Sequence, residues 1–380
     1  MNLKELRSTA LPALYKAGNT VIVKGGPGMG KTEAFYGFCA DQSKRMGKPF
    51  GLVTAIISGM DPVDLRGVFI PMKGDGGEAI VRATLPAIWP SKYNTDVFVD
   101  GRKLAKDEAR SHIEKHGLPA HGVMFIDEFS QADTDLQKVA AQIMLDRRIG
   151  EHVLPDNWMV CAAGNRTEDR AGVVKTLSHV QNRMCEVEVE PDYEAWQSWA
   201  FENEIHPLII GFAKSNAGEV FRTSVPKEQG PYCTPRSLVL CARNLEAMKG
   251  PNMNEHQLPD DHIASEVIKG WLGEGVLPKL ISHIRLANDL PEVEDVIARP
   301  DTTKVPDRLD ARFVMATSLS VHAKDTKKIR PILKYVSRMD VELQVLFVQG
   351  VVGRNPAALT VAEFAQWVQK NQKLILAANG

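Results

Sequence analysis

Eight residues near the start of the chain, Gly25-Gly26-Pro27-Gly28-Met29-Gly30-Lys31-Thr32, follow the apolar run Val21-Ile22-Val23 and precede an amphipathic segment. The glycines let main-chain N–H groups converge on phosphate oxygens, because a Cβ atom there would block the approach. The dipole of the following helix adds to this attraction. In this strand–loop–helix setting, the pattern G-x-x-x-x-G-K-[ST] predicts that all eight residues bind the phosphates of a nucleoside triphosphate.

Two side chains of this loop have further predicted roles. Lys31 can reach the β- and γ-phosphates, and the Thr32 hydroxyl can hold Mg²⁺. The alternative is an ordinary glycine-rich turn, which the flanking strand and helix patterns argue against. We therefore expect ATP and Mg²⁺ as the ligands.

A pair of carboxylates follows a second apolar run. Val123–Ile126 is predicted to be a buried strand, and Asp127-Glu128 comes directly after it. Ligands of α/β sheets bind at the carboxyl ends of strands, and adjacent carboxylates there need a cation to offset their repulsion. We predict that Asp127 holds Mg²⁺ with Thr32 and that Glu128 polarises the attacking water. The alternative is an acidic pair that caps the next helix.

Two further polar residues are candidates for the same site. Asn165 ends the next predicted strand, where its amide can align water or touch the γ-phosphate. Arg236 follows a predicted N-cap, Thr234, and a first helical residue, Pro235. A cation in the first turn opposes the helix dipole, so a bound phosphate nearby is one explanation and a solvated arginine the other.

Apolar runs separated by helical patterns predict an α/β fold with a five-stranded parallel sheet. Beyond about residue 191 only helical patterns remain. The insertion at 90–120 is predicted to hold a hairpin turn at Asp100-Gly101 and a charged helix, and a second hairpin is expected around Arg148–Asp156. The predicted strands are 19–24, 52–57, 123–126, 158–163 and 185–190, and the predicted domains are 1–190, 191–285 and 286–380, the last of which can belong to the second.

Composition limits the class of protein. The chain has 380 residues and is 44% hydrophobic, enough for a large core. Lysine and arginine number 46 and aspartate and glutamate 47, a balance that argues against a nucleic-acid coat protein without excluding a local basic groove. Five scattered cysteines, no apolar leader and no membrane-length apolar stretch predict a soluble, cytoplasmic protein with no membrane partner.

Three histidines approach the spacing of metal ligands, but the pattern is not H-E-x-x-H. We therefore favour a solvated helix face over a zinc site. The residues are His112, His116 and His121.

Taken together, the motifs resemble those of AAA+ ATPases, and finer details resemble the MoxR branch that works beside von Willebrand A-domain proteins. The matching pieces, within roughly residues 19–250, are GGPGMGKT, SGMDPVDLRG, VMFIDEFSQAD, IGEHVLP, CAAGN, QNRMCEVEVE and CTPRSL.

The resemblance implies a ring of identical chains, most simply a hexamer, in which a helical lid follows the nucleotide-binding domain. It implies that Arg183 is an arginine finger for the neighbouring site, with Arg166, Arg170, Arg147 and Arg148 as competitors for that role. By the same resemblance, Arg236 is the residue that reports nucleotide state from the lid, and Ser58 holds Glu128 inactive until a partner binds. The implied output is remodelling or maturation of a partner protein.

Two other functions stay open at this point. A nucleic-acid motor or loader of the AAA+ class would share these residues, although the near-neutral charge does not favour it. A P-loop kinase of small molecules would act as a monomer and would not need Arg183 from a neighbour.

Overall fold

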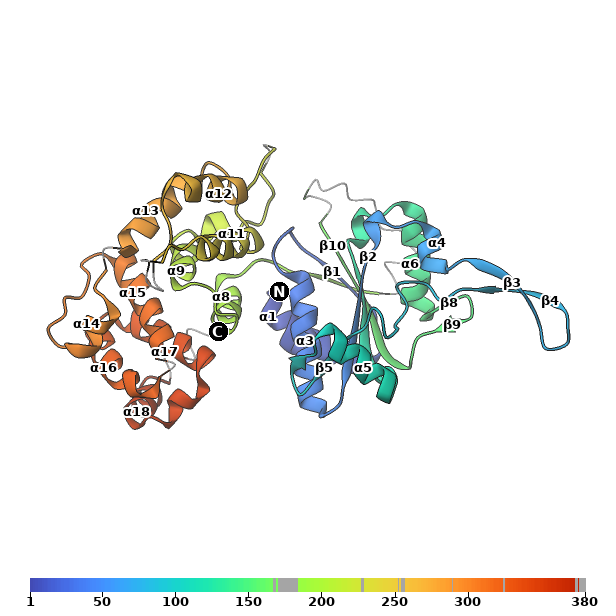
Figure 1. Ribbon diagram of the computed structural model, residues 1–380, viewed down its shortest axis with the longest axis horizontal. Helices are drawn as coiled ribbons and strands as arrows, with labels where there is room; N and C mark the ends of the chain where they lie inside the picture. Colours follow the sequence, from blue (N-terminus) through green and yellow to red (C-terminus); the bar gives the residue numbers. More distant parts are fainter. Residues whose placement is uncertain are drawn as a thin grey trace. The chain divides into compact units, whose positions relative to one another are not determined.

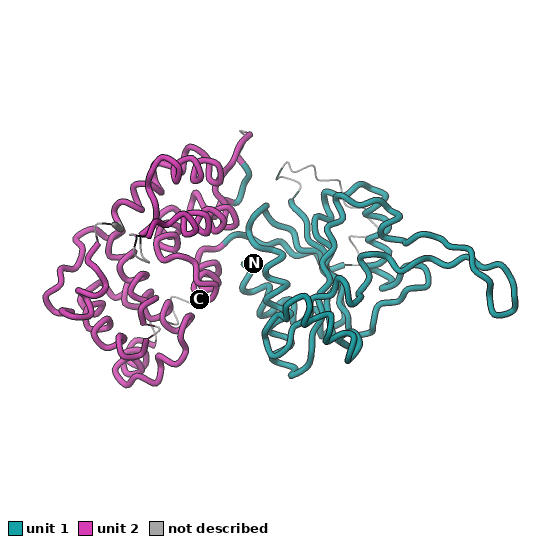
Figure 2. The backbone as a smooth tube through the Cα atoms, viewed as in Figure 1, with its two compact units in different colours: residues 1–191, 223–225 teal, residues 192–222, 226–380 magenta. Residues whose placement is uncertain are grey.

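A computed structural model describes residues 1–166, 169, 184–226, 229–251, 253, 257–288, 290–323, 325–372 and 375. The chain forms two compact units, shown in Figure 2. The α/β unit contains Met1–Pro191 and Thr223–Val225, and the helical unit contains Asp192–Arg222 and Pro226–Gly380. The finer division into domains 191–285 and 286–380 stays a prediction, and one hydrophobic core holds residues from both ranges.

The α/β unit is built on a seven-stranded sheet in the order β11-β1-β10-β7-β2-β5-β6. The first five strands in this order pair in parallel, which confirms the predicted parallel sheet. Their bounds are β1 Val21–Lys24, β2 Phe50–Ile56, β7 His121–Asp127, β10 Asn157–Gly164 and β11 Cys185–Glu188.

All five predicted parallel strands are present, and a hairpin from the insertion extends the sheet beyond β2. Strands β5 (Asp96–Val99) and β6 (Arg102–Lys103) are antiparallel to each other, and β5 is antiparallel to β2. Asp100 and Gly101 both have positive φ, 49° and 84°, and this conformation closes the tight turn between β5 and β6. The predicted hairpin is therefore correct, but it belongs to the main sheet. The charged helix of the insertion is α5, Lys106–His116.

Helices cover both faces of the sheet (Figure 1). Alternate residues of β1 show the two cores: Val21 and Val23 pack with helix α3, and Ile22 packs with helix α6. This alternation follows from the two-residue period of a strand. Helix α3 spans Lys31–Met46 and α6 spans Thr134–Asp146, and the N-terminal segments α1 (Leu3–Glu5), η1 (Leu6–Ala10) and α2 (Leu11–Ala17) pack beside α3.

Two small hairpins lie outside the main sheet. The predicted hairpin around Arg148–Asp156 is present as β8 (Arg148–Ile149) and β9 (His152–Val153). The other hairpin, β3 (Phe69–Lys73) with β4 (Ala79–Ala83), follows helix α4 (Pro62–Arg66) and was not predicted. It extends away from the sheet in Figure 1, and every residue of β3 is exposed. A strand with no buried face lacks the alternation that marks strands in a sequence.

The helical unit contains no strand among its described residues, in agreement with the helical patterns after residue 191. The run Thr360-Val361-Ala362-Glu363 has the pattern of a capping box, which predicts Thr360 as the cap of the last helix. This prediction is wrong: the helix begins at Ala362, and Thr360 instead donates its hydroxyl to the Ala357 carbonyl oxygen. None of the described helices is long and apolar enough to cross a bilayer. The helices are α8 Tyr193–Glu202, α9 Pro207–Ser215, α10 Ala217–Val220, α11 Pro235–Ala247, α12 His262–Leu272, α13 Leu277–Asn288, α14 Val293–Ala298, α15 Leu309–His322, α16 Thr326–Val336, α17 Val341–Arg354 and α18 Ala362–Lys370.

Candidate functional site

Three neighbouring parallel strands bring the predicted motifs to one edge of the sheet. In β1 and β10, Lys24 pairs with Gly164, and in β10 and β7, Ala162 pairs with Ile126. The glycine-rich loop and Asn165 directly follow β1 and β10, and Asp127 is the last residue of β7, so they lie together at the carboxyl edge. This edge is where α/β sheets bind ligands.

The glycine-rich loop has the backbone that its sequence requires. Gly28 and Gly30 have φ of 71° and 102°, a region that other residues rarely adopt. Gly25 has no space for a side chain, because a Cβ atom there would lie 2.6 Å from Met29 Sδ and 2.9 Å from the Val189 carbonyl oxygen. The loop leads directly into α3 at Lys31, so its N–H groups adjoin the positive end of a helix of 16 residues.

Lys31 is buried, with 8% of its surface exposed. Its Nζ donates hydrogen bonds to the carbonyl oxygens of Gly25 and Gly26, at 2.7 and 2.9 Å, and to Asn165 Oδ1 at 3.2 Å. These three acceptors are uncharged. A phosphate oxygen is a stronger acceptor for an ammonium group, so the lysine is placed to exchange these bonds for phosphate.

Thr32 and Asp127 lie in contact. The Thr32 hydroxyl donates to Asp127 Oδ2 at 2.7 Å, and Asp127 Oδ1 accepts from the Glu128 N–H at 2.9 Å. Hydroxyl and carboxylate oxygens are the ligands that Mg²⁺ prefers, with phosphate and water completing its shell. The residues present therefore fit the predicted Mg²⁺ site.

Glu128 adopts a left-handed backbone conformation, with φ of 58°. Its Oε2 accepts a hydrogen bond from the Ser58 hydroxyl, which follows the neighbouring strand β2. Glu128 precedes the short turn Phe129–Gln131 but makes no side-chain cap of it. A strained backbone and an uncapped turn are what we expect of a side chain positioned for chemistry.

Ser130 fixes the backbone of Asn165. Its hydroxyl accepts from the Asn165 N–H at 2.8 Å and donates to the Asn165 carbonyl oxygen at 3.2 Å. Gly164 makes this possible, because a Cβ atom there would lie 2.5 Å from Ser130 Oγ. Ser130 was not predicted from the sequence, where its only signal is its place two residues after Glu128.

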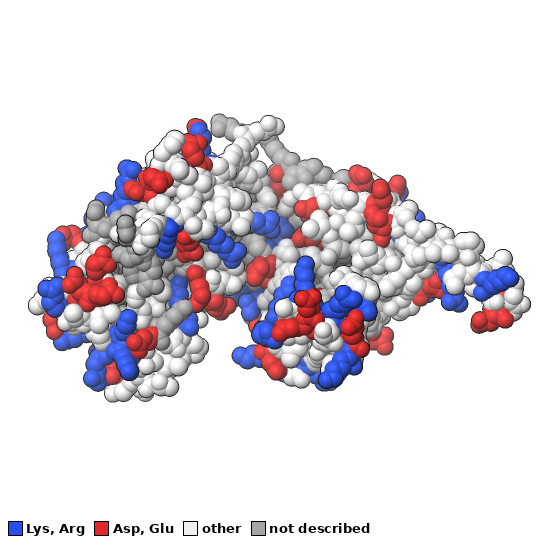
Figure 3. All heavy atoms as spheres, viewed as in Figure 1, with Lys and Arg blue, Asp and Glu red and all other residues white. Residues whose placement is uncertain are grey.

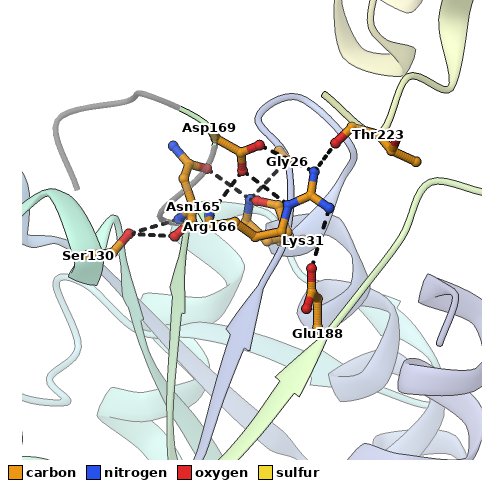
Figure 4. A network of polar contacts seen from close by, with 9 residues as sticks. Gly26, Lys31, Ser130, Asn165, Arg166, Asp169, Glu188 and Thr223 are labelled. Atoms are coloured by element: carbon orange, nitrogen blue, oxygen red, sulfur yellow. Dashed lines mark hydrogen bonds and ion pairs between the residues drawn. The ribbon is translucent and has the colours of Figure 1, made fainter. Parts of the chain in front are cut away.

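Arg166 lies at the centre of a buried polar network (Figure 4). Its side chain is 10% exposed and that of Asp169 is 2% exposed. The guanidinium contacts Asp169 through Nε at 3.3 Å and NH2 at 3.2 Å, Glu188 through NH1 at 3.4 Å, and the Thr223 carbonyl oxygen through NH2. Burial disfavours its charge, but the two carboxylates outweigh burial and raise the pKa of Arg166.

These contacts show which competing arginines are unsuited to act on a neighbouring chain. The buried contacts of Arg166 within its own chain contradict that role. Arg147 donates to the carbonyl oxygens of Pro155 and Asp156, both at 2.7 Å, and so supports the β8–β9 hairpin. Arg148 is exposed and donates to the Gly150 carbonyl oxygen at 2.9 Å. Arg183 and Arg170 lie outside the described residues.

Arg236 is exposed in the first turn of α11, in the helical unit. The predicted cap is confirmed, because the Ser237 N–H donates to Thr234 Oγ1 at 3.1 Å and Pro235 begins the helix. The first turn holds no acidic residue to offset the arginine.

The three histidines do not form one cluster. The rings of His112 and His116 lie 4.9 Å apart on α5, whereas His121 lies on β7 with its Nδ1 2.9 Å from the Tyr15 hydroxyl. Within the described part of the chain, no three His, Cys, Asp or Glu side chains are arranged to hold a metal ion.

Comparisons with known proteins add little to this geometry. No family model and no curated protein matches the chain. Among solved structures, NtrX from Brucella abortus is 16% identical, with 98% of this chain and 68% of that chain covered and a TM-score of 0.32. PCH-2 from C. elegans is 15% identical, with 74% and 68% covered and a TM-score of 0.31.

A replication initiator, DnaA bound to AMPPCP and single-stranded DNA, is 10% identical, with 98% and 92% covered and a TM-score of 0.24. Similarities at these scores carry no argument about this chain. Its own residues place the glycine-rich loop, the Thr32–Asp127 pair and the Glu128 carboxylate at one edge of a parallel sheet.

Proposed function

We propose that this chain is an AAA+ ATPase of the MoxR branch, which couples Mg²⁺-dependent ATP hydrolysis in a ring to remodelling of a partner protein. One observation supports this most: the contacts Lys31–Asn165, Thr32–Asp127 and Ser58–Glu128 lie at the ends of adjacent parallel strands. A small-molecule kinase needs the loop but has no evident use for a carboxylate held beside Asp127 by a hydroxyl.

In this proposal each residue has one task. The main-chain N–H groups of the loop and Lys31 bind the phosphates. Thr32 and Asp127 hold Mg²⁺, which neutralises charge that develops on the phosphate oxygens. Glu128 orients and polarises the attacking water, and Asn165 aligns the same water.

Ser58 regulates Glu128 in this proposal. While the Ser58 hydroxyl donates to Glu128 Oε2, that oxygen is occupied and is not available to accept a hydrogen bond from the attacking water. A partner that draws Ser58 away would release the carboxylate. The β3–β4 and β8–β9 hairpins are candidate contacts for that partner, and an A-domain protein is the partner class that the sequence resemblance implies.

The ring requires a residue from the neighbouring chain. We assign this role to Arg183, with Arg236 reporting nucleotide state from the helical unit. A guanidinium beside the γ-phosphate would stabilise the transferred phosphoryl group. On the face drawn in Figure 3, acidic and basic side chains are interspersed rather than gathered in a basic groove, and this favours a protein client over nucleic acid.

Mixing two inactive variants tests the ring. Lys31→Ala cannot bind phosphate but still supplies Arg183, whereas Arg183→Ala binds phosphate but lacks the finger. If hydrolysis occurs between neighbours, mixed rings recover part of the wild-type rate. No recovery, together with full activity of a dilute monomer, would contradict the ring and favour a kinase-like protein. Stimulation of hydrolysis by single-stranded nucleic acid at several salt concentrations would instead favour the nucleic-acid motor.

A further inference from the structure

Residues Asn165 and Arg166 face two different parts of the α/β unit. Asn165 Oδ1 accepts from Lys31 Nζ at 3.2 Å, on the side of the phosphate loop. The adjacent residue, Arg166, donates to the Thr223 carbonyl oxygen. Ser130 binds both the N–H and the carbonyl group of Asn165, so the backbone between the two side chains is fixed.

Thr223 belongs to a short segment with an unusual place in the chain. Thr223–Val225 packs with the α/β unit, whereas Arg222 before it and Pro226 after it belong to the helical unit. The chain thus returns to the α/β unit for three residues only. Because Thr223–Val225 is covalently joined to Arg222 and Pro226, a shift of this segment would also move the backbone of those two residues.

The Arg166 guanidinium also adjoins the phosphate loop. Its NH2 atom lies 3.6 Å from the point where a Cβ atom of Gly26 would be. Four hydrogen bonds to Asp169, Glu188 and Thr223 occupy most of its donors. A guanidinium with these partners is better suited to fixing Asp169, Glu188 and Thr223 relative to one another than to binding phosphate directly.

We propose that Arg166 is a positioning residue that couples the phosphate loop, through Asn165, to the segment Thr223–Val225. Phosphate bound to Lys31 would replace Asn165 as a partner of the lysine, and a resulting shift of Asn165 would carry Arg166 with it, because Ser130 holds the backbone between them as one rigid piece. The contact with Thr223 then passes the nucleotide state to the chain that enters the helical unit. This inference rests on the proposed function, because it needs a nucleotide in the loop.

Hydrogen exchange of the amides in Thr223–Val225, with and without ATP and Mg²⁺, measures this coupling. In the wild-type protein, ATP binding should change the exchange rate of this segment at least about 5-fold, a shift near 1 kcal/mol of local opening. In Arg166→Lys the charge stays, but a single ammonium group cannot replace the fork that reaches three partners. We expect this variant to bind ATP within about 3-fold of wild type, to hydrolyse it about 10-fold more slowly, and to lose the exchange response.

Arg7→Lys is the matched control. Arg7 makes a two-bond ion pair with Asp41, at 2.7 and 2.9 Å, in the same unit but outside the network. This variant should keep both the hydrolysis rate and the exchange response. If Arg166→Lys does not fold, Arg166→Met combined with Asp169→Leu replaces the buried ion pair with apolar side chains, which is often neutral for stability.

The outcomes separate the two proposals. An exchange response that persists in an Arg166 variant that binds ATP would overturn the coupling and leave the ATPase intact. A wild-type protein that hydrolyses ATP without any exchange response would do the same. A wild-type protein that neither binds nor hydrolyses ATP would overturn the proposed function, and the coupling with it.

Discussion

The α/β unit and the helical unit bury different kinds of polar side chain. Among the described residues, the buried lysine, arginine and aspartate side chains are Lys31, Arg166 and Asp169, and all three belong to the network of Figure 4. The buried polar side chains of the helical unit are neutral or histidine, and several bind the nearest backbone. They include Gln197, His206, His283, Thr317, Ser318, Ser320 and His322.

This difference indicates where function lies. Burying a charge costs several kcal/mol after relaxation, so a fold dedicated only to stability would use apolar side chains instead. Burying a histidine whose Nε2 lies 3.0 Å from a carbonyl oxygen, as His283 does with Leu208, costs little. In the described part of the chain, the helical unit buries only polar side chains of this second kind. The α/β unit buries charged side chains, and it does so at the edge of the sheet where nucleotide chemistry is proposed.

The largest effect expected is on hydrolysis. Glu128→Gln removes the charge that polarises water but keeps the size of the side chain, so the rate should fall at least about 100-fold while ATP binding remains. Single-turnover hydrolysis and equilibrium binding of ATP measure the two separately. Glu342→Gln, the same substitution at an exposed position of the helical unit, serves as the control and should leave both unchanged. A Glu128→Gln protein with normal turnover would remove Glu128 from the site.

The next effect compares the stability of the two units. Asp169→Ala leaves the buried Arg166 charge without its buried carboxylate partner and should lower the free energy of unfolding by about 3–5 kcal/mol. Gln197→Leu removes one neutral hydrogen bond to the Tyr193 hydroxyl, 2.9 Å long, and should cost about 1 kcal/mol. Urea unfolding of both variants measures the difference. Equal losses in the free energy of unfolding would mean that the buried ion pair of the α/β unit matters no more for stability than a neutral hydrogen bond of the helical unit.

A smaller change is expected at the contact that restrains Glu128. Ser58→Ala removes the hydroxyl that donates to Oε2, so basal hydrolysis without a partner should rise about 2- to 5-fold, the equivalent of a hydrogen bond of about 0.5–1 kcal/mol. Steady-state phosphate release measures this rate. A decrease would mean that Ser58 supports catalysis instead of restraining it.

The smallest effect is a pH dependence in the helical unit. Burial lowers the pKa of His283 below its usual value of 6.5, although the Leu208 carbonyl and Asp310 oppose the shift. The unfolded chain therefore binds more protons than the folded one as pH falls below 6.5, and stability declines in that range. Chemical unfolding at pH 7.5 and 5.5 should show a larger loss for wild type than for His283→Gln. Identical losses would exclude His283 as the source.

Prediction from sequence worked where the local pattern was strong. The run Val123–Ile126 is buried on both faces of the sheet, and so is most of Leu52–Ala55, so their apolar character marked them as strands; Ile56 is exposed and Ile57 lies beyond the strand. A glycine after a helical pattern predicts the end of a helix, and Gly47 does end α3 in the left-handed conformation. The phosphate loop, Asp127 and Asn165 were identified by spacing, and the fold brings all three to one edge.

Prediction failed where the structure depends on contacts across the fold. The β3 strand exposes all its residues, so no apolar period reveals it. Ser130 and Asp169 are single polar residues that matter only because the chain places them beside Asn165 and Arg166. Thr360 stands where the sequence pattern places a helix cap, but its hydroxyl donates instead to a carbonyl oxygen within the 3₁₀ turn Pro356–Thr360.

Calorimetric titration of ATP and Mg²⁺ into the wild-type protein and into Lys31→Ala tests the central claim most directly. A buried ammonium group that exchanges carbonyl oxygens for phosphate should make wild-type binding at least about 100-fold tighter than binding to the variant, a difference of about 2.7 kcal/mol. Wild-type protein that releases no heat with ATP, or a variant that binds equally well, would contradict the account of this edge of the sheet as a nucleotide site.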